Sequence, residues 1–333
     1  MVNVVISSAD RIAVATALLL AIRTHRVCLL NSDVPAGDYL VDYFGEPRSA
    51  RLVEPSELEA STATVAVVFA EGEDVAVGVA EVFRCAAPDL LVIIGGGLAA
   101  PVSAVRTARR YGLDGSRILL VGGFPFGGDT TTVNSEKVGI PAGFLAETSS
   151  EMQGLATEVF PEAFFTTGVG AVLSNLNALV HVPTMVLNAM SVERGDETRF
   201  YVESFGDSVC RLIAEVDTDR IRLGGTLGVE LVPIEQVMNE FYGGAGMRGE
   251  SLREMMNSFP PYQSLVLPTS FEHRFLAHDL RSTLGPMVEL ARILDVEAAA
   301  TESVVRIGEI LLDAQVLPDS RLVAREFLDL ATP

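Results

Sequence analysis

The first half of the chain alternates short apolar runs with stretches of helical periodicity, and this alternation restricts the fold more than any other feature. The apolar runs are residues 2–6, 26–30, 63–70, 90–96 and 117–123. Helical periodicity lies between them at 12–22, 72–86 and 101–112. Buried parallel strands are typically continuous apolar runs, and the helices that connect them cover both faces of the sheet. We therefore predict a doubly wound, mainly parallel α/β sheet of the Rossmann type, completed by short strands within 124–150.

From about Phe165 the strand signals almost vanish and helical periodicity continues to the end of the chain. The helical segments are 168–182, 207–225, 232–241, 250–258, 272–280, 285–294 and 300–315. Length alone suggests two domains for 333 residues. We expect a Rossmann-like domain at 1–165 and an all-α domain at 166–333, packed around a cleft. In open α/β sheets, ligands bind outside the carboxyl ends of the strands.

Composition limits the classes of function. The formal charge of −20 argues against nucleic acid and anionic membrane surfaces as partners. Lys137 is the only lysine, so Schiff-base chemistry would have to use that residue. The three cysteines are isolated, which predicts neither a metal site nor a disulfide framework. The apolar stretch Ile12–Ile22 is too short to span a membrane. A cytoplasmic protein that binds a small molecule is expected.

The first turn of the Rossmann-like domain lacks the GxGxxG fingerprint. Ser7, Ala9 and Ile12 stand at its three glycine positions. These glycines allow a tight turn, close approach of a diphosphate, and helix–strand packing. Asp10 would repel a diphosphate at the helix N-terminus, and Arg11 could counter that charge. A domain that binds NAD or NADP and a domain kept only as a scaffold both remain open.

Two further positions could contact the cofactor. Asn31 replaces the usual ribose-binding acid at the end of the second predicted strand, which suits a 2′-phosphate better than an acid would. Gly95 and Gly96 follow a buried strand, where the backbone can pass close to a nicotinamide. Consecutive glycines are also common in plain turns.

His181 lies in an apolar segment, SNLNALVHVPTMVLN, at residues 174–188. Pro183 disfavours helical geometry at the preceding residue, so we expect the helix to break or kink beside the histidine. An imidazole at such a break can face a cavity. It can also be a hydrogen-bonded core residue.

Several stretches of the second half resemble the opine dehydrogenase family, the octopine/nopaline dehydrogenase group. They are NLNALVHVPTMVLNA (175–189), the passage 192–230, FYGG, LREMMNSFPPY and LPTSFEHRFLAHDL, the last ending at residue 280. The resemblance runs from about residue 60 to 315. It implies an oxidoreductase that joins an amino group to a 2-oxo acid and reduces the imine with NAD(P)H.

The resemblance also assigns roles to residues. The family's catalytic histidine falls on His181, its partner aspartate on Asp279, and the arginine that binds the oxo-acid carboxylate on Arg274. Asn188 could orient His181 or contact substrate, and His273 is expected at the surface. Histidine suits proton transfer near neutral pH, and a guanidinium binds a carboxylate at two points.

Three hypotheses follow from these residues. The first is an opine-dehydrogenase-like enzyme with an atypical cofactor turn. The second is a cofactor-independent enzyme that uses the His/Asp pair for condensation, dehydration, isomerisation or cyclisation of an amino-acid-derived intermediate in specialised biosynthesis. The third is a non-catalytic pseudo-dehydrogenase. A homodimer is expected, because the helical domain of such folds often pairs.

Overall fold

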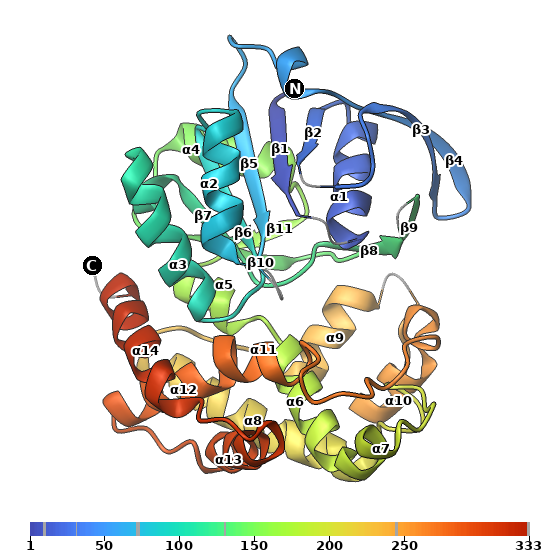
Figure 1. Ribbon diagram of the computed structural model, residues 1–333, viewed down its shortest axis with the longest axis vertical. Coiled ribbons are helices and arrows are strands. Elements are labelled where there is room, and N and C mark those ends of the chain that lie inside the picture. Colours follow the sequence, from blue (N-terminus) through green and yellow to red (C-terminus); the bar gives the residue numbers. More distant parts are fainter. Residues whose placement is uncertain (9–10, 31, 71–73, 130, 244–245, 332–333) are drawn as a thin grey trace. The chain divides into compact units, whose positions relative to one another are not determined.

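The computed structural model describes all residues except 9–10, 31, 71–73, 130, 244–245 and 332–333 (Figure 1). The chain forms two compact units. The first contains Met1–Gly95 and Ser103–Ala171, and the second contains Gly96–Val102 and Val172–Pro333. The predicted boundary at 165/166 lies a few residues before Ala171. The sequence did not indicate that Gly96–Val102 belongs to the second unit.

The first unit is built on an eleven-stranded sheet in the described part of the chain. Its strands are β1 Asn3–Ser7, β2 Arg26–Leu30, β3 Gly37–Tyr43, β4 Glu46–Leu52, β5 Thr64–Phe69, β6 Leu90–Ile94, β7 Ile118–Val121, β8 Phe126–Asp129, β9 Thr132–Glu136, β10 Ile140–Phe144 and β11 Ala163–Phe165. The order is β11-β10-β7-β6-β5-β1-β2-β4-β3-β9-β8. The six strands from β4 to β7 are all parallel neighbours, and in chain order they follow the dinucleotide-fold order 3-2-1-4-5-6. The predicted α/β class is confirmed.

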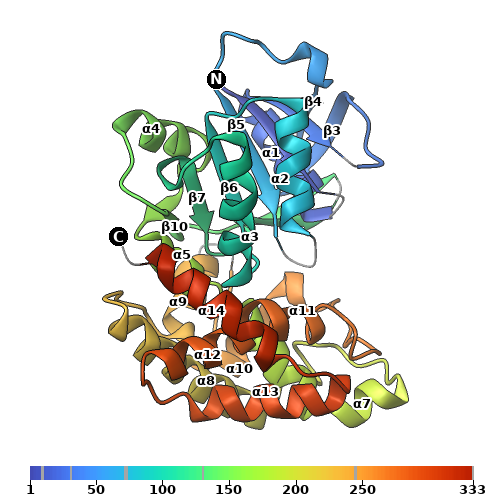
Figure 2. The same cartoon turned by 60° about the vertical axis from the view of Figure 1, so that its left-hand side comes forward.

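The helices that accompany the sheet are α1 Arg11–Ile22, α2 Val75–Cys85, α3 Ala99–Ala108, α4 Ser150–Val159 and α5 Gly168–Leu173 (Figure 2). Every residue of β1, β5, β6 and β7 is buried. The strands that are continuous apolar runs in the sequence are therefore the ones that the protein covers on both faces of the sheet. Helix α2 packs against β1 and β5, the strands between which the chain order reverses. That reversal is where ligands bind in such sheets.

A hairpin formed by β3 and β4 was not predicted. Phe44 and Gly45 form its turn, with φ of 53° and 83°. Two consecutive positive φ values are typical of the turns that match the twist of two-residue hairpins. Most side chains of β3 and β4 are exposed or half-buried, so these strands lack the continuous apolar run that marks β1 or β6. The β3–β4 hairpin can therefore not be found by searching for apolar runs.

The second unit is helical, as predicted. Its helices are α6 Asn177–Leu187, α7 Ala189–Arg194, α8 Asp207–Thr226, α9 Ile234–Tyr242, α10 Leu252–Ser258, α11 Ala277–Asp279, α12 Gly285–Ile293, α13 Ala299–Leu312 and α14 Leu317–Ala331. A π-helical turn, Leu280–Leu284, joins α11 to α12. Helix α6 packs against α8 and α13. Residues 168–187 are long and apolar enough to cross a membrane, but 83% of their most apolar window is buried within the protein.

A buried ion pair fixes α8 inside the second unit. Arg220 is 1% exposed, and its Nε donates to Oδ1 of Asp217 at 2.7 Å. Its other two nitrogens donate to the carbonyls of Leu173 and Val232. The second oxygen of Asp217 accepts the N–H of Ile234. Each charge is thus hydrogen-bonded, which a buried ion pair requires in order to be tolerated.

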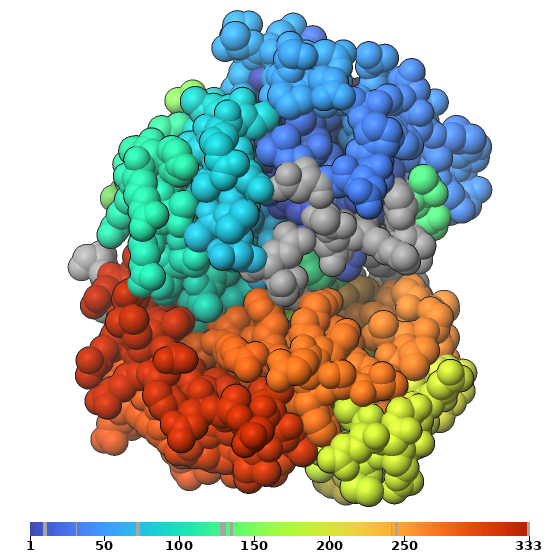
Figure 3. All heavy atoms as spheres, in the orientation of Figure 1, coloured from blue at the N-terminus to red at the C-terminus, as the bar shows by residue number. Residues whose placement is uncertain are grey.

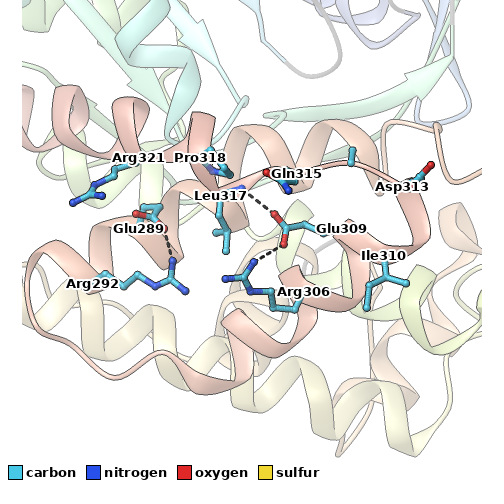
Figure 4. Close-up of a pocket in the computed structure, with 11 residues that line it drawn as sticks. Glu289, Arg292, Arg306, Glu309, Ile310, Asp313, Gln315, Leu317, Pro318 and Arg321 are labelled. Carbon is cyan, nitrogen blue, oxygen red and sulfur yellow. Dashed lines mark hydrogen bonds and ion pairs between the residues drawn. The ribbon is translucent and has the colours of Figure 1, made fainter.

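A pocket of about 850 Å³ lies between α12, α13 and α14 (Figure 4). Two of its arginines are paired with nearly buried glutamates, Arg292 with Glu289 and Arg306 with Glu309. Glu309 also accepts the N–H of Leu317 and so caps the start of α14. The hydrogen bond from Leu317 to Glu309 connects α14 to α13, whereas each of the two ion pairs lies within one helix. None of the site residues predicted from the sequence lines this pocket.

Candidate active site

The structure brings His181 and Asp279 into direct contact. Nδ1 of His181, on α6, lies 2.8 Å from Oδ2 of Asp279, the last residue of α11. The two residues are only 5% and 3% exposed. A buried carboxylate on one ring nitrogen fixes the orientation and the tautomer of the imidazole.

Burial controls the electrostatics of this pair. It raises the pKa of the Asp279 carboxyl to about 6, while the positive charges of His278 and Arg274 oppose the shift. The pKa of this carboxyl therefore lies close to the ordinary value for a histidine. Burial thus moves the titration of this carboxyl toward the neutral range that acid–base catalysis uses.

Aromatic rings hold the imidazole in place. The His181 ring stacks on Phe275, with ring centres 3.8 Å apart and planes inclined by 18°. The ring of Phe200 packs edge-on against both rings of this stack. Its centre lies 5.8 Å from that of the imidazole and 5.1 Å from that of Phe275. Both phenylalanines are buried. Packing of this kind locks a rotamer and so fixes the direction of Nε2.

Arg274 approaches the same ring. Its guanidinium carbon lies 5.0 Å from the centre of Phe275, within the range of a cation–π contact. Its backbone carbonyl accepts the N–H of Asp279 at 3.2 Å. Two of the three residues predicted for catalysis, His181 and Arg274, therefore contact Phe275, and the third, Asp279, contacts His181. Phe275 itself was not predicted from the sequence, although it directly follows Arg274.

The backbone after Asp279 is unusual. The π-helical turn Leu280–Leu284 follows it, and such turns are frequent at functional sites. Gly97 packs against this turn with φ of +55°; a Cβ on it would lie 1.9 Å from Oγ1 of Thr283. Gly95 and Gly96, which we predicted to contact the cofactor, also have positive φ. Only glycine fits at position 97, because both the φ and the space exclude a side chain.

The predicted break in the helix beside His181 is wrong. Helix α6 continues from Asn177 to Leu187 with Pro183 inside it. Proline lacks the N–H that would bond the carbonyl of Leu179 and costs about 3 kcal/mol within a helix. Residues 178–186 are all buried, so packing of α6 against its neighbours outweighs this cost.

Asn188 ends α6, and its side chain is committed to the backbone. Its amide nitrogen donates to the carbonyls of Thr184 and Ser204, both at 2.8 Å. An amide nitrogen carries two hydrogens, and both are used in these bonds. The geometry thus gives Asn188 a structural role at the junction of α6 and α7.

The predicted cofactor turn is described only in part. Ala9, Asn31 and the side chain of Arg11 lie outside the described residues. Ser7 ends β1, is 2% exposed, and donates from Oγ to Oε2 of Glu81 on α2 at 2.9 Å. Gly78 brings α2 close, because a Cβ there would lie 2.9 Å from Val68.

This arrangement is a poor fit for a diphosphate. The residue at the first glycine position is a serine whose hydroxyl already bonds a carboxylate. That carboxylate adds negative charge beside the turn that a diphosphate must approach, at the point where the strand order reverses. Among the described residues, no group of three His, Cys, Asp or Glu side chains is placed to hold a metal ion.

Comparisons with known sequences point to opine dehydrogenases. The model of the NAD/NADP octopine/nopaline dehydrogenase alpha-helical domain matches residues 168–312. Opine dehydrogenase of Arthrobacter sp. (strain 1C) is 25% identical over 153 residues, which are 46% of this chain and 42% of that protein. Vitopine synthase of Allorhizobium ampelinum (strain ATCC BAA-846 / DSM 112012 / S4) is 24% identical over 204 residues, 59% of this chain and 56% of that protein. The chain thus spans about half the length of these relatives.

Solved structures share the two-part fold. Octopine dehydrogenase in complex with NADH and agmatine has a TM-score of 0.73 at 13% identity, over 98% of this chain and 96% of that one. Yersinopine dehydrogenase with NADP⁺ bound has a TM-score of 0.67 at 12% identity, over 99% of both chains. A Rossmann-like unit followed by a helical unit is thus common to all of them, and residues 168–312 of this chain are similar to the helical domain of the octopine/nopaline dehydrogenases.

Proposed function

We propose that the protein acts on an imine formed from an amino group and a 2-oxo acid, with His181 and Asp279 as the acid–base pair. The observation that carries this proposal is the buried contact of 2.8 Å between Nδ1 of His181 and Asp279. The similarity of residues 168–312 to the helical domain of octopine/nopaline dehydrogenases supports the substrate class.

The roles follow from the chemistry of imine formation. The amine nitrogen attacks the carbonyl carbon of the oxo acid, and the resulting hydroxyl must leave as water. Nε2 of His181 donates the proton that makes this hydroxyl a leaving group. Asp279, on the opposite ring nitrogen, stabilises the imidazolium form. Arg274 binds the carboxylate of the oxo acid with its planar guanidinium and so holds the reacting carbon still.

In the first candidate function, the imine is then reduced, as the family name implies. When bound, NAD(P)H would supply the hydride. Solved structures of octopine and yersinopine dehydrogenases with NADH or NADP⁺ support this candidate. The residues of this chain would contribute binding of the carboxylate and the transfer of protons.

A second candidate function omits the hydride, and the contact between Ser7 and Glu81 favours it. Here His181 and Asp279 catalyse condensation, dehydration, isomerisation or cyclisation of an amino-acid-derived compound. Proton transfers alone are sufficient for these reactions.

One experiment tests the proposal and separates the two candidates. The protein is incubated with pairs of amines and 2-oxo acids, with and without NADH or NADPH. Loss of nucleotide absorbance is followed beside NMR of the oxo acid. The first candidate requires consumption of nucleotide, and the second requires conversion without it. Both must be lost in His181→Ala and kept in the control variant Glu272→Ala, at an exposed position of the neighbouring segment. Conversion that persists in His181→Ala contradicts the proposal.

A further inference from the structure

The pocket between α12, α13 and α14 and the exposed side chain of Ile310 beside it form one continuous surface. We propose that this surface is the contact between two copies of the chain in a two-fold dimer. The inference is independent of the proposed function, because none of the active-site residues described above lines the pocket. Three observations carry it: an exposed apolar side chain beside a hollow, a local balance of charge, and the positions of two charges.

Ile310 is highly exposed for an apolar side chain. It lies on α13, lines the pocket and is 77% exposed, more than any other large apolar residue that the structure describes. Ile307 and Leu322 directly follow two residues that line the pocket, and they are 43% and 59% exposed. Red residues of α13 and α14 form part of the surface shown in Figure 3. Apolar side chains gathered at a hollow in this way mark a surface that binds another protein.

The charges that line the pocket are balanced, although the chain as a whole is strongly acidic. Three arginines and three acidic residues line it, so its formal charge is zero, whereas the chain carries −20. Two copies of a chain with this charge repel each other over most of their surface. They meet without this repulsion where the local charge is zero. A strongly acidic or strongly basic partner would find no net charge to bind at this surface, so the balance favours a second copy.

Two charges of this surface are left over for a partner. Arg321 and Asp313 are exposed, and within the described part of the chain neither side chain forms an ion pair. They lie at opposite ends of the pocket (Figure 4). A two-fold axis that crosses the surface between them places Arg321 of each copy opposite Asp313 of the other. Both pairs then form at once, and Ile310 of each copy lies over the pocket of the other.

Sedimentation equilibrium of the full chain tests the dimer. The wild type should dimerise at micromolar concentration. Ile310→Glu should raise the Kd of the dimer by about 100-fold or more, because a two-fold interface contains each substitution twice. Leu40→Glu is the matched control, since Leu40 is 69% exposed on β3 of the first unit. A wild type that stays monomeric at about 100 µM overturns the inference and leaves the pocket to another kind of ligand. Equal Kd values for the two variants also overturn it.

A mixing experiment tests the two-fold arrangement. Arg321→Asp and Asp313→Arg each place two like-charged pairs in the interface, so the Kd of either variant alone should rise by about tenfold or more. When the two are mixed, both pairs of the mixed dimer have opposite charges, and its affinity should return to that of the wild type. If the mixed variants associate no more tightly than each alone, the arrangement is wrong.

A second variant covers a failure of Asp313→Arg to fold. Asp313 has a φ of +48°, which disfavours arginine, and a thermal melt shows whether this variant is folded. Asp313→Asn suits this φ and removes the same charge, so it should weaken the dimer by about threefold or more. A dimer of Asp313→Asn that is as tight as the wild type contradicts the pairing with Arg321.

Discussion

His181 and Asp279 are separated by 98 positions in the chain, yet Nδ1 of the imidazole and Oδ2 of the carboxylate lie 2.8 Å apart in the helical unit. Helices α6 and α11 bring them together, and Phe275 stacks on the imidazole four residues before the aspartate. Both side chains are nearly inaccessible to solvent, so the carboxylate is a fixed partner of Nδ1.

Replacement of the carboxylate should separate its catalytic role from its packing role. We expect Asp279→Asn to lower kcat by about 10²- to 10⁴-fold, because an amide favours the wrong imidazole tautomer and does not stabilise the imidazolium. Steady-state kinetics beside a thermal melt checks this. Glu272→Gln is the control, because it makes the same change from carboxylate to amide at an exposed position seven residues away, and an equal loss in both variants would contradict the assignment.

The same carboxyl should make stability depend on pH. Burial raises its pKa from 3.8 to about 6. A carboxyl with a raised folded pKa contributes stability below its unfolded pKa, and this contribution is lost as pH rises through the folded value. The unfolding free energy of the wild type, relative to Asp279→Asn, should therefore fall between about pH 4 and pH 6. The pKa difference corresponds to about 3 kcal/mol at most. Urea unfolding of both proteins at several pH values measures this, and a difference that rises with pH would refute it.

The parts of the fold that depend on apolar runs could be predicted from the sequence, while parts that depend on packing could not. The strands β1, β2, β5, β6 and β7 are continuous apolar runs, so their parallel arrangement followed from periodicity. The β3–β4 hairpin is mostly exposed and carries no such signal. Pro183 led us to predict a break in the helix, but α6 continues through it. The free energy that the proline costs the helix is smaller than the free energy that burial of α6 contributes.

The site was predictable through residue types and resemblance, and its supporting contacts were not. His181, Arg274 and Asp279 were named from a family pattern, but no pattern places Phe275 between them. Glu81 lies on a helix far along the chain from Ser7, so only the fold shows that its carboxylate meets the first turn. The same holds for Gly97, whose need to be glycine comes from Thr283.

The buried ion pair of Arg220 and Asp217 should be essential for stability. Loss of the guanidinium in Arg220→Ala leaves the carboxylate buried without its partner, which costs about 3–5 kcal/mol. Arg253→Ala is the matched control, because Arg253 also pairs with a residue of α8, Asp207, but both side chains are about half exposed or more. Exposed pairs contribute at most about 1 kcal/mol. Chemical denaturation measures both variants, and similar losses would contradict the role assigned to burial.

Gly97 should tolerate no side chain, for a reason that is specific to the turn after Asp279. In Gly97→Ala the new Cβ overlaps Thr283, so the π-helical turn must move and shift the carboxylate from His181. Gly228 is the control, because its φ of +73° is similar but no atom lies within 4 Å of the position that a Cβ would occupy. Gly228→Ala should therefore show only the backbone cost of about 1 kcal/mol. Gly97→Ala should be less stable than this and also lose turnover. Equal stability of the two variants would disprove a packing role for Gly97.

Glu81 should determine how well a dinucleotide is accepted at the first turn. Glu81→Gln keeps a hydrogen-bonding partner for Ser7 but removes the charge next to the place that a diphosphate would approach. Removal of one like charge at this range is worth about 1–2 kcal/mol, so the Kd of NADH or NADPH should fall by about tenfold. Calorimetry with each nucleotide measures this, and Glu151→Gln on α4 gives the same change in net charge at an exposed position. If the two variants bind alike, or if Glu81→Gln binds more weakly than the wild type, then the carboxylate does not oppose the diphosphate. The preference for a reaction without hydride would then lose its basis.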